Sequence, residues 1–199
     1  MKKVVLIGDS IRLSYWQRVK QILENEGVCE VYAPLDNCSY TLNIIRRIRV
    51  WFRDMGVEHA DLIHWNSGIW EHHRNTDDMA PFSTPEMYLT YNKRLLRQMQ
   101  KYGDRLIWAS TTPAGKHYHY DPNGLCGIPL EEWNREIDLY NGILSSYLIT
   151  QGVTINDLNS LIGADTDRFI TDDGIHLTPE GEEAAAEQVA SVIRARLAE

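Results

Sequence analysis

The sequence has few of the features expected of a secreted or membrane-bound chain. It contains three cysteines, an odd number with no Cys-x-x-Cys pair, which fits a reducing compartment better than a disulfide framework. No apolar run approaches the roughly 18 to 20 residues needed to span a bilayer. The apolar run near the N-terminus stops at Gly8, which makes it too short for the hydrophobic region of a signal peptide. We therefore expect a cytoplasmic protein with no membrane partner.

Basic residues are also in the minority. The chain has 20 Lys and Arg against 28 Asp and Glu, a formal net charge of -8 and a sequence pI of about 5.4. Such a surface repels phosphate backbones and anionic headgroups unless a local basic patch overrides the average. Nucleic acid is therefore not an expected partner.

The composition is that of one globular domain. Of the 199 residues, 43% are hydrophobic and 24% are charged, which is enough apolar material for one sizeable core. The sequence contains no internal repeat and no low-complexity tract. We expect a single domain over residues 1-199, and the sequence leaves its oligomeric state open.

Short apolar runs alternate with helical segments, and the runs lack a clean period of two. This pattern is typical of strands buried on both faces of a parallel sheet, which predicts an α/β fold. Five strands are expected at Lys3–Gly8, Val28–Ala33, Leu62–Asn66, Arg105–Ser110 and Val153–Asn156. Five helices are expected at roughly Tyr15–Asn25, Thr41–Phe52, Pro85–Lys101, Leu130–Thr150 and Thr178–Leu197.

Gly8-Asp9-Ser10 follows the first expected strand and precedes a helical segment. Ser10 should therefore lie at the carboxyl edge of the sheet, where open α/β folds bind ligands. The start of the helix also offers backbone N–H groups that could stabilise a developing oxyanion. The simpler alternative is that Ser10 only caps the helix.

A second signal lies near the C-terminus, where Asp172 and Asp173 precede His176 and a helix that starts at Thr178-Pro179. Serine is a poor nucleophile unless an imidazole accepts its proton and a carboxylate orients that imidazole. Asp173 and His176 could supply both groups from one turn. A lone Asp-x-x-His is more often a solvated turn, so the pairing with Ser10 carries the argument.

Gly8-Asp9-Ser10 together with the segment from Asp173 to Gly181 resembles the SGNH/GDSL hydrolase superfamily. The resemblance implies a flavodoxin-like three-layer α/β/α sandwich with a central, mostly parallel five-stranded sheet. It also implies Ser10 as nucleophile and, through its N–H, as oxyanion donor. His176 would be the general base and Asp173 the group that orients it, and the competing Asp172 lacks the family's spacing to His176.

The chain departs from the family pattern in the two segments that normally complete the oxyanion hole. The family has a Gly after the second strand, but the segment Pro34–Thr41 has none. Either the N–H of Asn37 or that of Cys38 substitutes, or the donor is missing; we assign Cys38 to the oxyanion hole and Asn37 to substrate binding. After the third strand, Asn66 is the expected side-chain donor, although an Asn at a strand end is also a common turn former.

Histidines and aromatic residues follow the expected strand ends. Adjacent His72 and His73 cannot easily share a metal ion, and His117 and His119 lack further well-spaced ligands, so no metal site is expected. We interpret the loops that carry these histidines as the rim of a cleft, and we assign Trp70 and His72 to substrate binding. Such a rim suits a sugar or another polar acyl carrier.

Taken with the resemblance, these residues predict a serine esterase that cleaves a small acyl ester, such as an O-acetyl group on a carbohydrate, through an acyl-enzyme on Ser10. Its partner would be a small-molecule or carbohydrate ester, and no cofactor is expected. Two alternatives stay open at this point. The same triad could transfer the acyl group to an alcohol, or the chain could be a non-catalytic ligand-binding protein that keeps the fold.

Overall fold

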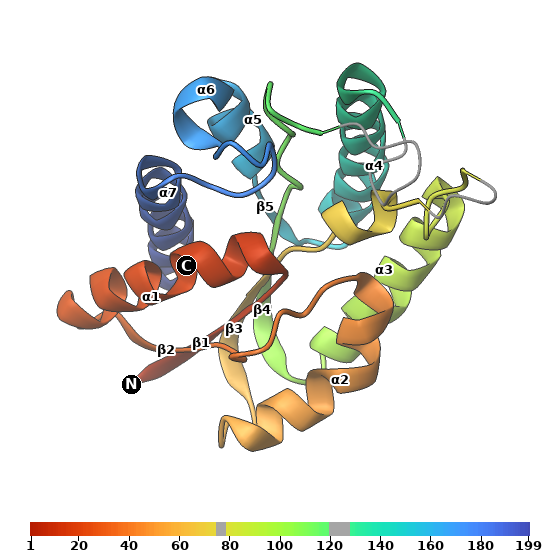
Figure 1. The fold of residues 1–199 in the computed structure, drawn as a ribbon. Coiled ribbons are helices and arrows are strands. Elements are labelled where there is room, and N and C mark those ends of the chain that lie inside the picture. Colours follow the sequence, from red (N-terminus) through yellow and green to blue (C-terminus); the bar gives the residue numbers. More distant parts are fainter. Residues whose placement is uncertain (75–78, 120–127) are drawn as a thin grey trace.

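The computed structural model describes residues 1–74, 79–119 and 128–199, and these form an α/β fold around one sheet (Figure 1). The sheet has five parallel strands in the order β2-β1-β3-β4-β5. The strands are β1 (Lys2–Ile7), β2 (Cys29–Tyr32), β3 (Ala60–Trp65), β4 (Gly103–Ala109) and β5 (Thr154–Asn156). The predicted fold class is confirmed, and every predicted strand is present within a few residues of its expected bounds.

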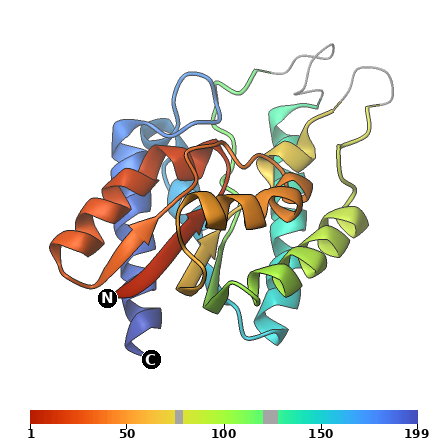
Figure 2. The same ribbon diagram turned by 90° about the horizontal axis from the view of Figure 1, so that it is seen from below.

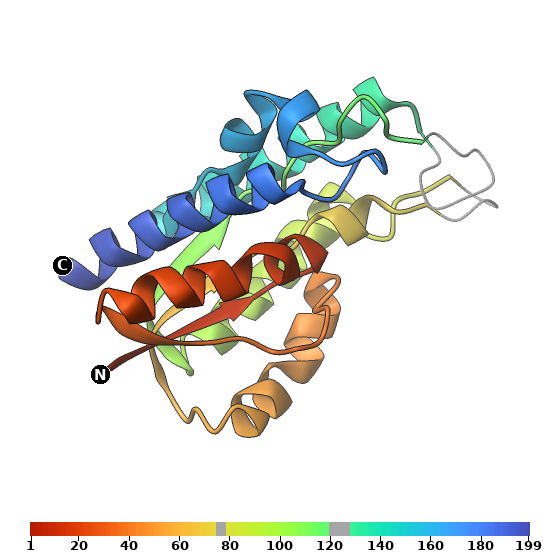
Figure 3. The same ribbon diagram turned by 60° about the vertical axis from the view of Figure 1, so that its left-hand side comes forward.

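Helices cover both faces of the sheet, which explains why the strands lack a polar face. The long helices are α1 (Ser10–Asn25), α2 (Thr41–Asp54), α3 (Pro85–Met99), α4 (Leu130–Thr150) and α7 (Pro179–Ala198). Val4 and Leu6 point to the α1 and α7 side, whereas Val5 and Ile7 point to the α2 and α3 side. Figure 2 shows the two helical layers on either side of the sheet, and Figure 3 shows α1 and α7 side by side.

Helix boundaries follow capping side chains where these exist. Helix α4 has its predicted bounds, but α1 begins five residues earlier than expected because the Asp9 carboxylate accepts a hydrogen bond from the N–H of Ile11. Thr178 caps α7 through the N–H of Gly181, as its position before Pro179 predicts. Three short helices complete the described fold: η1 (Ile69–His72), α5 (Leu158–Gly163) and α6 (Thr166–Phe169). Of these, η1 and α6 were not predicted, because segments of four residues show no helical period.

The strand order places the candidate site residues together. In this order the chain reverses direction across the sheet between β1 and β3, which is the point where parallel α/β folds bind ligands. Gly8 follows β1 at that point, and Asn66 follows β3 beside it. Among the described residues, no helix is both long enough and apolar enough to cross a membrane.

Candidate active site

The structure brings Ser10, His176 and Asp173 into one hydrogen-bonded chain at the carboxyl edge of the sheet. Ser10 Oγ lies 2.9 Å from His176 Nε2, and His176 Nδ1 lies 2.7 Å from Asp173 Oδ2. The two ring nitrogens therefore contact different partners, one a hydroxyl and the other a carboxylate. This is the arrangement in which an imidazole can accept a proton from a serine.

The turn that carries Ser10 is held by buried polar contacts. Asp9 is 1% exposed, and its Oδ1 accepts hydrogen bonds from the N–H of Ile11 at 3.0 Å and from Asn66 Nδ2 at 2.8 Å. Burial raises the pKa of Asp9, and these hydrogen bonds oppose the rise. Asp9 therefore supports the turn and positions Asn66.

Gly8 leaves the space that the Asn66 side chain occupies. A Cβ atom at position 8 would lie 1.8 Å from Asn66 Oδ1 and 2.7 Å from the Cβ of Arg12. No side chain fits at that distance, so the glycine is required by close approach. The Asn66 amide keeps one N–H beyond the bond to Asp9, because a primary amide has two donors.

The Asp173–His176 loop is more exposed and is held by its own turn. Asp173 Oδ1 accepts three hydrogen bonds, from Thr171 Oγ1 and from the N–H groups of Ile175 and His176. Burial alone would raise the pKa of Asp173, but these hydrogen bonds lower it well below its ordinary value, so the carboxylate stays ionised. Gly174 has a φ of +78°, and a Cβ there would lie 2.1 Å from the backbone nitrogen of Tyr118.

Asp172 and Asp173 contact different histidines. The fully exposed Asp172 carboxylate lies 3.6 Å from Nε2 of His117, a residue of the loop after β4. Only Asp173 contacts His176 among the described carboxylates. The choice between the two acids therefore agrees with the i to i+3 spacing on which the sequence argument relied.

The loop after β2 differs from the expectation at Cys38. Its backbone N–H donates to the carbonyl of Gly8 at 3.0 Å, so it is not free to stabilise an oxyanion, and its side chain is buried. Ser39 in this loop has a positive φ of 51°. Asn37 accepts the N–H of Ser39 on its side chain at 2.9 Å and lines the cleft.

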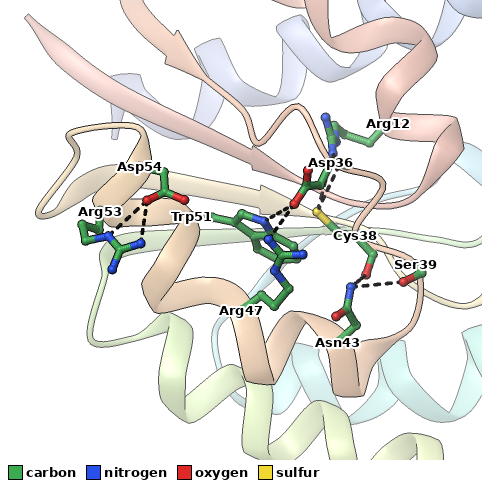
Figure 4. A network of polar contacts seen from close by, with 9 residues as sticks. All are labelled: Arg12, Asp36, Cys38, Ser39, Asn43, Arg47, Trp51, Arg53 and Asp54. Carbon is green, nitrogen blue, oxygen red and sulfur yellow. Dashed lines mark hydrogen bonds and ion pairs between the residues drawn. The ribbon is translucent and has the colours of Figure 1, made fainter.

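Sequence reasoning missed Arg12. This side chain is fully buried and donates to the carbonyls of Pro34 at 2.8 Å, Asp36 at 2.7 Å and Gly8 at 3.1 Å. Figure 4 shows it reaching from α1 over the loop at Asp36 and Cys38. By binding carbonyls of both site loops, Arg12 fixes one loop against the other in the place where the family's glycine is absent. An arginine in the first turn of a helix gives no sequence signal for this role.

A cleft of about 380 Å³ opens over the serine. It is lined by Ser10, Asn37, Ile69, Trp70, His73, Asp173, Ile175 and His176. Trp70 was expected here, and His73 was not. The Trp70 and His73 rings lie 5.2 Å apart. Burial, with a smaller effect from the neighbouring His72, lowers the pKa of His73 to about 4, so its ring is neutral at pH 7.

His72 does not line this cleft, which corrects its assignment to substrate binding. Its side chain is fully buried, packs 4.3 Å from the Tyr140 ring and places Nδ1 3.3 Å from Glu136. The 3₁₀ turn η1 directs adjacent side chains in different directions, and no pattern in the sequence indicates that turn. His72 therefore belongs to the core behind the cleft.

Glu71 is a second buried acid behind the site. Its Oε1 accepts hydrogen bonds from the N–H and the hydroxyl of Thr41, at 2.7 and 2.6 Å, and so holds the start of α2. Burial raises the pKa of Glu71 to about 7. The carboxyl group thus links η1, beside the cleft, to the helix that follows the Asn37 loop.

The histidines considered as metal ligands do not form a site in the described part of the chain. In residues 1–74, 79–119 and 128–199, no three His, Cys, Asp or Glu side chains lie close enough to hold a metal ion. Asp121, the carboxylate nearest His117 and His119 in the sequence, lies outside the described residues, as does Cys126. Cys29 and Cys38 are free and buried.

Comparison with solved structures places the fold among ester-hydrolysing enzymes. An α/β hydrolase, LAE5, from the metagenome of Lake Arreo matches with a TM-score of 0.75 and 14% identity over 98% of this chain and 96% of that one. Est24, a carbohydrate acetylesterase from Sinorhizobium meliloti, matches with a TM-score of 0.73 and 14% identity over 98% of this chain and 100% of that one. A catalytic mutant of Axe2, an acetylxylan esterase from Geobacillus stearothermophilus, matches with a TM-score of 0.70 and 11% identity over 98% of this chain and 94% of that one.

Other solved structures with the same fold are described as a GDSL-like lipase from Bacteroides thetaiotaomicron and an acylhydrolase from Bacteroides fragilis. No protein-family model and no curated protein matches the sequence. At identities of 11 to 17%, the likeness concerns the fold and not the substrate. The chain therefore has the fold of the SGNH/GDSL lipases, acylhydrolases and acetylesterases.

Proposed function

We propose that the protein is a serine esterase that cleaves small acyl esters through an acyl-enzyme on Ser10. The observation that carries this proposal is the chain of hydrogen bonds from Ser10 through His176 to Asp173 at the floor of an open cleft. A helix-capping serine has no need of an imidazole at 2.9 Å. Nor does it need that imidazole to be held by an ionised carboxylate.

The two chemical steps follow from these contacts. His176 Nε2 accepts the Ser10 proton as Oγ attacks the ester carbonyl, and Asp173 stabilises the imidazolium that forms. The same Nε2 then protonates the leaving alcohol, so the C–O bond of the ester breaks and the acyl group stays on Ser10. In the second step His176 removes a proton from water, which attacks the carbonyl carbon of the acyl-enzyme. His176 then returns that proton to Ser10 Oγ as the bond between Oγ and the acyl carbon breaks, which releases the carboxylic acid and restores the serine.

Three donors are proposed for the oxyanion that forms in each step. The N–H of Ser10 lies at the start of α1, where the helix dipole favours negative charge. The second N–H of the Asn66 amide is available, and Asp9 fixes the orientation of that amide. Because the N–H of Cys38 is bonded to Gly8, the N–H of Asn37 is the remaining donor of the two that the sequence suggested. Removing one such donor typically lowers the rate on the order of 100- to 1,000-fold.

The shape of the cleft favours a small acyl group on a polar carrier. A volume of about 380 Å³ is near the lower end for small-molecule sites, and Ile69 and Ile175 give it an apolar part. Trp70 and the neutral His73 offer a ring for stacking and a nitrogen for hydrogen bonding, which suits a sugar. Two proteins of the same fold are a carbohydrate acetylesterase and an acetylxylan esterase. We therefore infer that the substrate is an O-acetylated carbohydrate.

The test is p-nitrophenyl acetate turnover together with labelling by a fluorophosphonate probe. We expect Ser10→Ala to abolish both and His176→Ala to lower both by several orders of magnitude. Ser14→Ala is the matched control, because Ser14 lies one turn further along α1 and its hydroxyl donates to the carbonyl of Ile11. A wild-type protein that neither turns over the ester nor reacts with the probe would overturn the proposal and favour a non-catalytic ligand-binding role.

A further inference from the structure

Two neighbouring helices carry a concentration of positive charge that the rest of the acidic chain lacks. Helices α2 and α3 pack side by side on one face of the sheet (Figure 1). With Lys101 in the turn after α3, they hold eight of the 20 Lys and Arg but only two of the 28 Asp and Glu. The α2–α3 basic face is defined by six exposed residues: Arg46, Arg49, Arg53, Arg94, Arg97 and Lys101.

Five of the six cations of the basic face have no acidic partner among the described residues, although Arg47, also on α2, pairs with Asp36. On the opposite face of the sheet, Arg18 pairs with Glu183, and Arg194 pairs with Glu26. On the basic face only Arg53 forms an ion pair among the described residues, with its neighbour Asp54. Like charges on adjacent helices repel one another, so the face is left with an attraction for anions that the protein itself does not satisfy.

The basic face also contains a hollow that could hold a ring. A groove of about 430 Å³ lies at the C-terminal end of α2 and is lined by Arg49, Arg53, Phe52 and Tyr102, with Glu58 at its side. The Phe52 and Tyr102 rings lie 4.7 Å apart and are tilted by 39°. Phe52 is 2% exposed and forms the floor of the groove, so the partly exposed Tyr102 ring is the one that offers a stacking surface beside the guanidinium groups.

The basic face leads toward the cleft. The chain enters α2 at Thr41, four residues after Asn37, which lines the cleft. Arg53 lies at the other end of the helix, away from Cys38 (Figure 4). A polymer lying along α2 would therefore have the groove at one end and the candidate active site at the other.

We propose that the α2–α3 basic face binds an acidic polysaccharide, a chain of uronate sugars, and holds it while an acetyl group on that chain enters the cleft. The proposal deepens the proposed esterase function and rests on it for the substrate. Arg46, Arg49 and Arg53 follow one another at about 5 Å along the helix axis, because three to four residues rise that far. Duplex DNA carries one charge per about 1.7 Å, so it is far more densely charged than this stripe.

The test is the binding of fluorescein-labelled oligogalacturonate, followed by fluorescence anisotropy at about 50 mM salt. We compare two double variants that change the net charge equally. Arg49→Gln with Arg97→Gln removes two cations of the basic face, and Arg18→Gln with Arg194→Gln removes two from the opposite face. We expect at least a tenfold loss of affinity in the first and less than a twofold change in the second.

Binding and turnover are measured separately, so the two proposals fail separately. Anisotropy needs no catalysis, and an inactive wild type that binds oligogalacturonate through Arg49 and Arg97 would overturn the esterase proposal alone. The binding proposal is overturned if the wild type does not bind oligogalacturonate, or if both double variants lose affinity equally. It is also overturned if neutral xylo-oligosaccharide binds with the same affinity as oligogalacturonate, or if single-stranded DNA or phosphatidylserine vesicles bind more tightly.

Discussion

The two halves of the candidate site are built in different ways. The Ser10 half is buried: Asp9 is 1% exposed, Arg12 is fully buried, and both contact groups from other elements. The half that contains Asp173 and His176 is exposed: these side chains are 52% and 49% accessible to solvent. Its hydrogen bonds come almost entirely from within one short turn.

The difference shows two ways to hold a reactive group in place. The buried half relies on long-range packing, so a change there should affect stability and activity together. The exposed half relies on local backbone geometry, so a change in its side chains should affect activity with little effect on folding. Each of the following predictions tests this division.

The largest effect is expected from Asp173→Asn. An amide can still accept the backbone N–H groups of the turn, but it cannot accept the proton on His176 Nδ1, so the imidazole loses the partner that orients it. We expect kcat for p-nitrophenyl acetate to fall on the order of 1,000-fold, with a melting temperature near that of the wild type.

Asp172→Asn is the control for this change, because Asp172 is fully exposed and contacts His117. We expect its kcat to stay within about twofold of the wild-type value. If Asp173→Asn instead lowered the melting temperature as strongly as a core substitution, the exposed half would not be locally held.

A smaller effect on rate, together with a loss of stability, is expected from Gly8→Ala. The added methyl group would lie 1.8 Å from Asn66 Oδ1, so the amide must leave its place beside Asp9. We expect kcat to fall on the order of 100-fold and the free energy of unfolding to fall by about 2 kcal/mol.

Gly142→Ala gives a matched comparison, because a Cβ at that helical position meets no atom within 4 Å. This substitution should raise stability by about 0.5 to 1 kcal/mol and leave kcat unchanged. Equal results for the two alanine variants would contradict the close approach of Asn66 to Gly8.

The smallest effect is a dependence of stability on pH that comes from Glu71. Its pKa in the folded protein, about 7, lies above its ordinary value of 4.5, so folding takes up a proton between these values. The stability from this group is present below about pH 4.5 and is lost as the pH rises through 7. The difference in unfolding free energy between wild type and Glu71→Gln should therefore grow by about 2 kcal/mol, in favour of the wild type, on going from pH 7.5 to pH 5.5.

Urea unfolding of both proteins at each pH measures this difference, and other titrating groups cancel because they are common to both. The buried His64 acts in the opposite direction, since burial lowers its pKa to about 3. A difference that does not change with pH would mean that Glu71 is ionised in the folded protein throughout this range.

The sequence predicts the exposed half of the site better than the buried half. Asp173 and His176 lie three residues apart in one turn, so their contact depends on local geometry that a spacing can express. The place of Ser10 at the site can be predicted from the sequence because Ser10 follows a strand. The role of Arg12 cannot, because its carbonyl partners at Pro34 and Asp36 lie 22 and 24 residues further along the chain.

The two corrected assignments fail for the same kind of reason. Cys38 is in the expected loop, but whether its N–H faces the cleft depends on the carbonyl of Gly8, a residue from another element. His72 and His73 are adjacent, and the fold decides which of them faces the cleft through the short turn η1. Strands and long helices, by contrast, follow from apolar runs and caps, and the bounds of α4 and the start of α2 agree with prediction.

The hydrogen bond between Ser10 and His176 joins residues 166 positions apart, and α1 packs against α7. A ribosome makes the chain from its N-terminus, so Ser10 and all five strands are synthesised before His176 exists. An unfinished chain therefore has a serine without a base, however well its sheet has formed. Under the proposed mechanism, the order of translation thus keeps the nascent chain inert until the final helix docks beside the first.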